Sequence, residues 1–301
     1  MTRMRRGLRR LGTAVGFVVL AALGWIALTV VLLWHRQERV VFQPPALVPS
    51  APAVARRVDF AAGDGHALHG FLVTPGRTAV PATVVIGFHG NADLSAWLVP
   101  WGRELAERSG AIVFLPEYRG YGGIPGASTY ATSALDARGA LAWARAEFPE
   151  ARIVLFGHSL GSAIASELAA HMAPDKPAAL VLQSPFTSAQ AMATRMLVPP
   201  IPGLWSLISR VHYDTRRIVA SLDAPVSVSH GTRDVVIPAR MGRAVHAAAR
   251  QAGELLIVDG AGHNDVADVA GAAYWRWLTA AVSPPGVQLQ EERRGRLPGL
   301  M

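Results

Sequence analysis

The segment Gly157-His158-Ser159-Leu160-Gly161 fits the pattern G-x-S-x-G, in which the central serine can act as a nucleophile. The apolar run 152–156 before it predicts a buried strand, and the run 162–170 after it predicts a helix. Ser159 would then occupy a sharp turn from strand to helix that lifts its hydroxyl above the edge of a sheet. Glycine is expected on both sides because a side chain there would clash with the neighbouring strand and helix. The pattern is common by itself, so its meaning depends on partners elsewhere in the chain.

A serine hydroxyl reacts only when a base removes its proton and a further group orients that base. In proteins with this elbow, the acid and then the histidine follow the serine along the chain. Asp234 follows the predicted strand 225–230, and His263 follows the predicted strand 254–259. Sites in open α/β sheets lie at such carboxyl ends of strands. We therefore predict a catalytic triad of Ser159, Asp234 and His263.

Other acids and histidines stand near these positions. Asp259 and Asp265 flank His263 and are alternative acids, but side chains so near in sequence rarely face the same imidazole nitrogen. His158 is interpreted as a packing residue, and His230 as a residue at the end of a strand.

A fourth element is the His-Gly-Asn turn that follows the predicted strand 83–86. A turn at this place supplies one backbone N–H for an oxyanion, and the residue after the nucleophile supplies the other. The predicted donors are the backbones of Asn91 and Leu160. Removing one such donor costs about 2.7–4 kcal/mol of transition-state stabilisation. His89, in the same turn, is expected to be structural.

Six segments in this order resemble the α/β-hydrolase superfamily, in particular the Bem46-like, ABHD13-like and ABHD17-like group of membrane-anchored serine hydrolases. The segments are His89-Gly90-Asn91-Ala92, Glu117-Tyr118-Arg119-Gly120-Tyr121-Gly122, the elbow at Ser159, Ser184-Pro185-Phe186-Thr187-Ser188, Gly231-Thr232-Arg233-Asp234 and Gly262-His263-Asn264-Asp265. The resemblance implies the same triad and a mostly parallel central sheet flanked by helices. Glu117 stands where the family usually has Asp, and we expect that position to be structural. The group includes depalmitoylating thioesterases and esterases, so the resemblance does not define a substrate.

The folded part is predicted to be one α/β domain over residues 57–282, because strand and helix patterns alternate there without an internal repeat. An apolar, irregular insertion at about residues 185–215 is expected to form a small cap over the site. Phe186 and Trp205 are candidate walls of a substrate pocket. The alternative is that the apolar residues of the insertion only pack the cap onto the core.

The run Leu11 to Trp34 contains 24 residues without a charge. As a helix it would be about 36 Å long, which exceeds the roughly 30 Å of a bilayer's hydrocarbon core. Five arginines lie in residues 1–10, and a positive flank stays in the cytoplasm. We predict a cytoplasmic basic segment (1–10), a transmembrane signal anchor (11–34), a proline-rich linker (35–56) that is extended over residues 42–52 and a disordered tail (283–301). The hydrolase domain would then lie outside a bacterial inner membrane, although Arg36 and Arg39 make the far flank basic as well.

The formal net charge of +8 does not indicate nucleic-acid binding. It comes mainly from the N-terminal arginines, and the domain itself carries 19 basic and 18 acidic side chains. The chain has no cysteine, which excludes disulfides and a cysteine nucleophile. No histidine and carboxylate cluster has the spacing of a metal site, and no glycine-rich cofactor motif is present, so no metal and no cofactor are predicted.

These observations predict a serine hydrolase that cleaves an acyl ester or thioester, with a small-molecule or lipid acyl substrate near the membrane. A serine peptidase of the same fold is the alternative enzyme, because the same triad cleaves amides. A non-catalytic binding module with this fold is the alternative from another class, and it would require a broken triad. The sequence does not specify an oligomeric state.

Overall fold

The computed structural model describes residues 2–48, 50–76, 82–172, 175–197 and 201–284. These residues form an α/β domain around an eight-stranded sheet with the order β1-β2-β4-β3-β5-β6-β7-β8. The strands are β1 (Arg56–Ala61), β2 (Ala67–Val73), β3 (Thr83–Phe88), β4 (Ile112–Pro116), β5 (Arg152–His158), β6 (Ala179–Gln183), β7 (Pro225–Gly231) and β8 (Gln251–Val258). Only β2 pairs antiparallel with its neighbours, β1 and β4, at one edge. The predicted mostly parallel sheet is confirmed.

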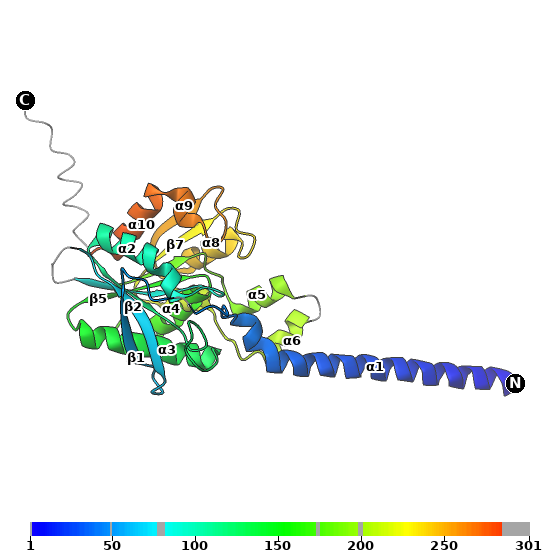
Figure 1. Ribbon diagram of the computed structural model, residues 1–301. Coiled ribbons are helices and arrows are strands. Elements are labelled where there is room, and N and C mark those ends of the chain that lie inside the picture. Colours follow the sequence, from blue (N-terminus) through cyan, green and yellow to red (C-terminus); the bar gives the residue numbers. More distant parts are fainter. Residues whose placement is uncertain (1, 49, 77–81, 173–174, 198–200, 285–301) are drawn as a thin grey trace, which may run out of the picture.

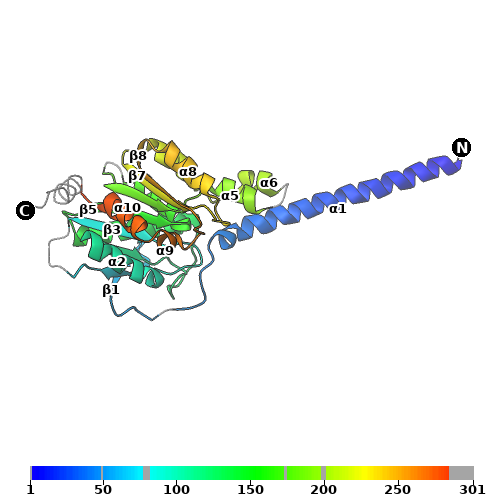
Figure 2. The same ribbon diagram turned by 90° about the horizontal axis from the view of Figure 1, so that it is seen from above.

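Helices pack on both faces of this sheet, and the first helix projects away from it (Figures 1 and 2). The helices are α1 (Thr2–Val41), the short 3₁₀ helix η1 (Ser95–Leu98), α2 (Val99–Ser109), α3 (Tyr130–Glu147), α4 (Leu160–Ala170), α5 (Ala189–Met196), α6 (Ile201–Ile208), α7 (Thr215–Ser221), α8 (Ala239–Ala248), α9 (Val266–Ala270) and α10 (Ala272–Val282). One apolar cluster contains residues of α3, α4 and α8, and a second contains residues of α2, α9 and α10. Strand β5 contributes to both, with Leu155 in the first and Val154 and Phe156 in the second. Alternate side chains of a strand point to opposite faces, so a sheet covered on both sides reads as a continuous apolar run.

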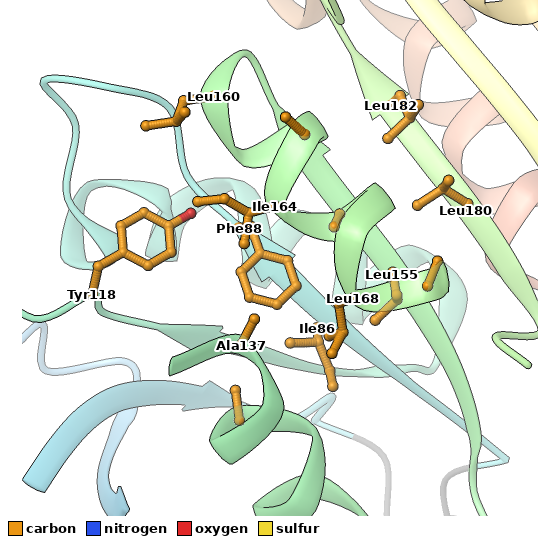
Figure 3. Packing of buried hydrophobic residues seen from close by; sticks show 14 of the residues in the cluster. Ile86, Phe88, Tyr118, Ala137, Leu155, Leu160, Ile164, Leu168, Leu180 and Leu182 are labelled. Atoms are coloured by element: carbon orange, nitrogen blue, oxygen red, sulfur yellow. The ribbon is translucent and has the colours of Figure 1, made fainter. Parts of the chain in front are cut away.

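Helix α4 is the central helix of the first layer, and it follows the elbow directly. Figure 3 shows Ile164 and Leu168 on this helix close to Ile86 and Phe88 of β3 and to Leu155 of β5. All of these side chains are buried. The packing holds the start of α4 in place above the carboxyl ends of β3 and β5, and this is the edge at which the sequence predicts the site.

The insertion after β6 is more regular than the sequence suggested. We expected an irregular cap at about residues 185–215, but the described part of it contains the helices α5 and α6 and reaches the first turn of α7. The proline-containing stretch 198–200 lies outside the described residues. Ser188 caps the start of α5, because its side chain accepts a hydrogen bond from the backbone N–H of Ala191 at 3.1 Å.

The N-terminal helix is longer than predicted. Residues 35–41, assigned above to the proline-rich linker, continue α1 to Val41. No glycine or proline interrupts these residues, whereas Pro44 and Pro45 follow soon after the end and stop the helix. The segment Gly12–Val41 is long and apolar enough to cross a membrane, and it projects away from the domain (Figure 1). Most of the predicted tail, residues 285–301, lies outside the described residues.

Candidate active site

Ser159 occupies a strained turn between β5 and α4. Its φ of 53° and ψ of −116° lie in a region that residues with a side chain rarely adopt. A Cβ on Gly157 would lie 2.2 Å from the backbone oxygen of Gly161. A Cβ on Gly161 would lie 2.1 Å from the backbone oxygen of Phe88. Both glycines are therefore required by close backbone contacts, as the pattern predicted. The Ser159 N–H donates to the Gln183 carbonyl at 3.0 Å, which ties the turn to strand β6.

One series of hydrogen bonds joins Ser159, His263 and Asp234. Along the chain, Asp234 follows Ser159 by 75 residues and His263 follows Asp234 by 29 residues. The Nε2 atom of His263 is 2.9 Å from the Ser159 Oγ, and its Nδ1 atom is 2.7 Å from the Asp234 Oδ2. A carboxylate only accepts hydrogen bonds, so Nδ1 carries the proton and Nε2 is left free to accept the serine proton. Asp234 lies after β7 and His263 lies after β8, at the same sheet edge as the elbow.

The Asp234 carboxylate is buried, and both of its oxygen atoms accept hydrogen bonds. Its Oδ1 atom accepts from the backbone N–H groups of Val236 at 2.9 Å and Ile237 at 2.7 Å. Burial would raise the pKa of Asp234, but hydrogen bonds from His230, His263 and the Ile237 backbone outweigh it and hold this pKa well below its usual range. The carboxylate is therefore ionised at neutral pH and oriented toward the imidazole.

The alternative acids have other partners. Asp259 accepts from the Thr232 hydroxyl at 2.9 Å, and Asp265 accepts from the Gly262 backbone N–H at 2.6 Å. His230, interpreted from sequence as a strand-end residue, is a second partner of the acid, with its Nε2 atom 3.1 Å from the Asp234 Oδ2 and 2.7 Å from the Ile237 carbonyl. Its spacing of four residues from Asp234 is the only sequence signal that could have revealed this contact.

His158 has a more specific place than the packing role we expected. Its Nε2 atom is 3.2 Å from the backbone oxygen of His263, and the two rings are 5.2 Å apart. Burial, assisted by the nearby His263, lowers the pKa of His158 to about 4. His158 is therefore neutral at physiological pH, and its Nε2–H holds the loop that carries His263.

The turn with Asn91 lies beside the elbow because Phe88 at the end of β3 pairs with Gly157 of β5. A Cβ on Gly90 would lie 3.5 Å from the Cβ of Ser159, so the backbone of this turn runs next to the nucleophile. Leu160 is the first residue of α4, where an N–H has no partner within its own helix. Both predicted oxyanion residues, Asn91 and Leu160, line the same cavity as Ser159.

A buried pair supports this turn from below. The His89 Nε2 atom is 2.7 Å from Glu117, and its Nδ1 atom is 2.8 Å from the Gly90 carbonyl. Burial would lower the pKa of His89, but the adjacent Glu117 carboxylate outweighs it and raises this pKa. Glu117 also accepts from the N–H and hydroxyl of Ser95, at 3.1 and 2.9 Å. The contacts of His89 and Glu117 are those of structural residues, since they brace the turn.

A cavity of about 870 Å³ opens above Ser159 and His263. Its size falls in the range of small-molecule sites. The candidate wall residues Phe186 and Trp205 both line it, and both also pack into the apolar core. Two residues of the last turn of α1, Val40 and Val41, and Gln43 just after it line the cavity as well, and no sequence signal pointed to them.

The sheet, the elbow and the site at its carboxyl edge define an α/β-hydrolase. Residues 79–218 match the family described as serine aminopeptidase, S33. An uncharacterized protein of Mycobacterium tuberculosis is 36% identical over 259 residues, covering 83% of this chain and 87% of that protein. The chain therefore belongs to the α/β-hydrolase superfamily, as the sequence motifs suggested.

Further comparisons agree on the fold. The human α/β-hydrolase domain-containing protein 17B is 30% identical over 181 residues, which cover 59% of each chain. The structure of an esterase from Pyrococcus furiosus superposes with a TM-score of 0.61 at 19% identity, covering 79% of this chain and 96% of the esterase. The protein is thus a hydrolase by family, with an esterase-like fold.

Proposed function

We propose that this protein is a serine hydrolase that cleaves an acyl ester or thioester through an acyl-enzyme intermediate. The observation that carries this proposal is the continuous series of hydrogen bonds from Ser159 Oγ through the His263 ring to Asp234. A non-catalytic binding module needs no such series, and it would not need the strained backbone at Ser159.

The proposed reaction follows from these contacts. His263 Nε2 takes the Ser159 proton as the serine oxygen attacks the acyl carbonyl, and Asp234 stabilises the imidazolium that forms. The backbone N–H groups of Asn91 and Leu160 stabilise the oxyanion, each worth several kcal/mol. The protonated His263 then gives its proton to the leaving alcohol or thiol. Water, activated by the same imidazole, hydrolyses the acyl-enzyme and restores the serine.

The apolar cavity wall and the N-terminal helix favour a lipid or other acyl substrate near a membrane. Phe186 and Trp205 offer apolar surface, and the acidic side chains that line the cavity, Asp93 and Asp268, would not attract an anionic substrate. The five arginines before the apolar part of α1 favour an N-terminus in the cytoplasm, which would place the hydrolase domain on the extracytoplasmic side. The family description as serine aminopeptidase supports a peptidase as the second candidate.

The first experiment is labelling of the full chain, in detergent micelles, by a fluorophosphonate that reacts with activated serines. We expect labelling of the wild type and none of Ser159→Ala, with Ser206→Ala, an exposed serine on α6, as the matched control. We also expect turnover of p-nitrophenyl acyl esters to exceed that of aminoacyl p-nitroanilides. Absence of labelling in folded wild type would refute the hydrolase proposal, and faster anilide turnover would favour the peptidase.

A further inference from the structure

The end of α1 is fixed to the cap of the domain. The Gln37 side chain is buried, and its Oε1 atom accepts a hydrogen bond from the Arg210 backbone N–H at 2.7 Å. Arg210 also donates to the Trp34 carbonyl at 3.1 Å, and its guanidinium lies 4.7 Å from the centre of the Trp34 ring. It pairs with Glu38 at 3.5 Å. Figures 1 and 2 both show α6, which precedes Arg210, beside this end of α1.

The contact continues into the active site. Phe42, the first residue after α1, is 4% exposed and packs in the main apolar cluster. The next backbone N–H, from Gln43, donates to the Asn91 Oδ1 at 2.8 Å. Val40 and Val41 line the cavity above Ser159. The last turn of α1 and the residues that follow it are therefore part of the cavity wall, whereas the apolar part of the helix projects away from the domain.

The rim of the cavity carries large apolar side chains that are open to the outside, beside the exposed polar residues Gln43, Asn264 and Asp268. Four large apolar side chains line the cavity and are also exposed, by 45% to 64% of their surface. They are Val40, Trp97, Met196 and Val236. They come from α1, η1, α5 and the loop after β7, so four separate elements place apolar surface at one opening. Exposed apolar patches of this kind mark contact with a membrane or another apolar partner.

The length of α1 sets the height of this opening above a bilayer. The uncharged run ends at Trp34, and Val40 follows six residues later, which is about 9 Å along a helix. The headgroup layer on each side of the hydrocarbon is about 5–8 Å thick. Val40 and the cavity mouth would thus lie at the outer border of the headgroups, with Trp34 at the depth where tryptophan is enriched.

We propose that the last turn of α1 is the entrance to the acyl pocket, through which one acyl chain of a membrane-resident ester or thioester passes from the leaflet to Ser159. The proposal rests on the serine-hydrolase function given above. The apolar side chains of the rim accept a chain that leaves the headgroup layer beside α1, and the cavity of about 870 Å³ has room for it. Selectivity for long chains in a bilayer would then depend on the rim.

The test compares two substrates with the full chain reconstituted in phosphatidylcholine vesicles. One is a long-chain fluorogenic acyl ester carried in the same vesicles, and the other is a soluble short-chain ester. The readout is the ratio of kcat/KM for the long-chain ester to that for the short-chain ester. Val40→Glu and Met196→Glu alter the rim from two different elements, so misfolding of one variant leaves the other as a test. Val54→Glu is the control, since Val54 is 50% exposed and is not part of the cavity wall.

We expect the ratio to fall at least about tenfold in both rim variants, comparable to losing the burial of about two methylene groups. The control should keep the wild-type ratio. Fluorophosphonate labelling in the same vesicles separates the two proposals. If the wild type and both rim variants are labelled and have the same ratio of kcat/KM values, the proposed entrance is refuted and the serine-hydrolase proposal is not. Wild-type protein that is neither labelled nor active on either ester would overturn the serine-hydrolase proposal and the entrance with it.

Discussion

Replacing Asp234 by Asn should abolish most of the activity while leaving the site almost unchanged in shape. The Oδ1 atom of Asp234 accepts from two backbone N–H groups, those of Val236 and Ile237. An amide nitrogen cannot face these donors, so in Asp234→Asn the amide oxygen must stay there and the NH₂ group must take the place of Oδ2. The NH₂ group would then donate to the Nδ1 atom of His263, which is 2.7 Å from Oδ2 in the wild type. It could no longer accept from the His230 Nε2 atom, which keeps its hydrogen bond to the Ile237 carbonyl.

The consequence is a change of tautomer in His263. If Nδ1 accepts a hydrogen bond, the ring proton moves to Nε2, which is 2.9 Å from the Ser159 Oγ. A protonated Nε2 cannot take the serine proton. Loss of the general base in this way costs about 10³- to 10⁴-fold in kcat, or about 4–5.5 kcal/mol of activation free energy. Asp234 is not part of the cavity wall, so we expect KM to change by no more than about threefold.

The assay is steady-state hydrolysis of a soluble short-chain ester, with the rate of fluorophosphonate labelling as a second readout. Asp259→Asn is the matched control, because Asp259 is an exposed acid near His263 that bonds to Thr232 instead. It should retain activity within about threefold. If Asp234→Asn kept more than about a tenth of the wild-type kcat, the tautomer argument would be refuted.

Two further predictions concern stability. The pKa of His158 is lowered from 6.5 in the unfolded chain to about 4 in the folded protein. Below pH 6.5 the unfolded chain therefore binds a proton that the folded protein does not, so the free energy of unfolding decreases as the pH falls from 6.5 toward 4. Chemical unfolding in detergent should show up to about 2 kcal/mol less stability at about pH 5 than at about pH 7.5, and His158→Asn should reduce this difference; a pH-independent wild type would contradict it. Gly161→Ala would place a Cβ 2.1 Å from the Phe88 carbonyl, whereas a Cβ on Gly203 of α6 meets nothing within 4 Å. We expect the first to destabilise by about 3 kcal/mol or more and the second to be neutral or slightly stabilising, and equal unfolding free energies for the two variants would refute the close-contact argument.

The sequence was sufficient to predict which three side chains the structure brings together. The elbow is a local feature, since a strand, a glycine-flanked serine and a helix occupy adjacent residues. Asp234 and His263 each follow a strand, and parallel strands bring their carboxyl ends to one edge. The local pattern and the direction of the strands therefore carry enough information to predict the candidate triad.

The sequence was less informative about the insertion and about the supporting histidines. The apolar stretch after β6 gave no clear period, yet most of its described residues are helical. The supporting roles of His158 and His230 became visible only through their distances to the His263 carbonyl and to Asp234. Those distances depend on how the loops after β7 and β8 turn, and no local pattern encodes them.

The length and composition of residues 11–34 were enough to predict a long apolar helix there, because helix length and apolar content are local properties. Only the tertiary structure placed the end of that helix in the wall of the cavity. The contact between Gln37 and Arg210 joins residues 173 positions apart, and the contact between Gln43 and Asn91 joins residues 48 apart. Such contacts are set by the packing of α1 against the cap and the core, which depends on the whole fold and leaves no periodic signal in the sequence.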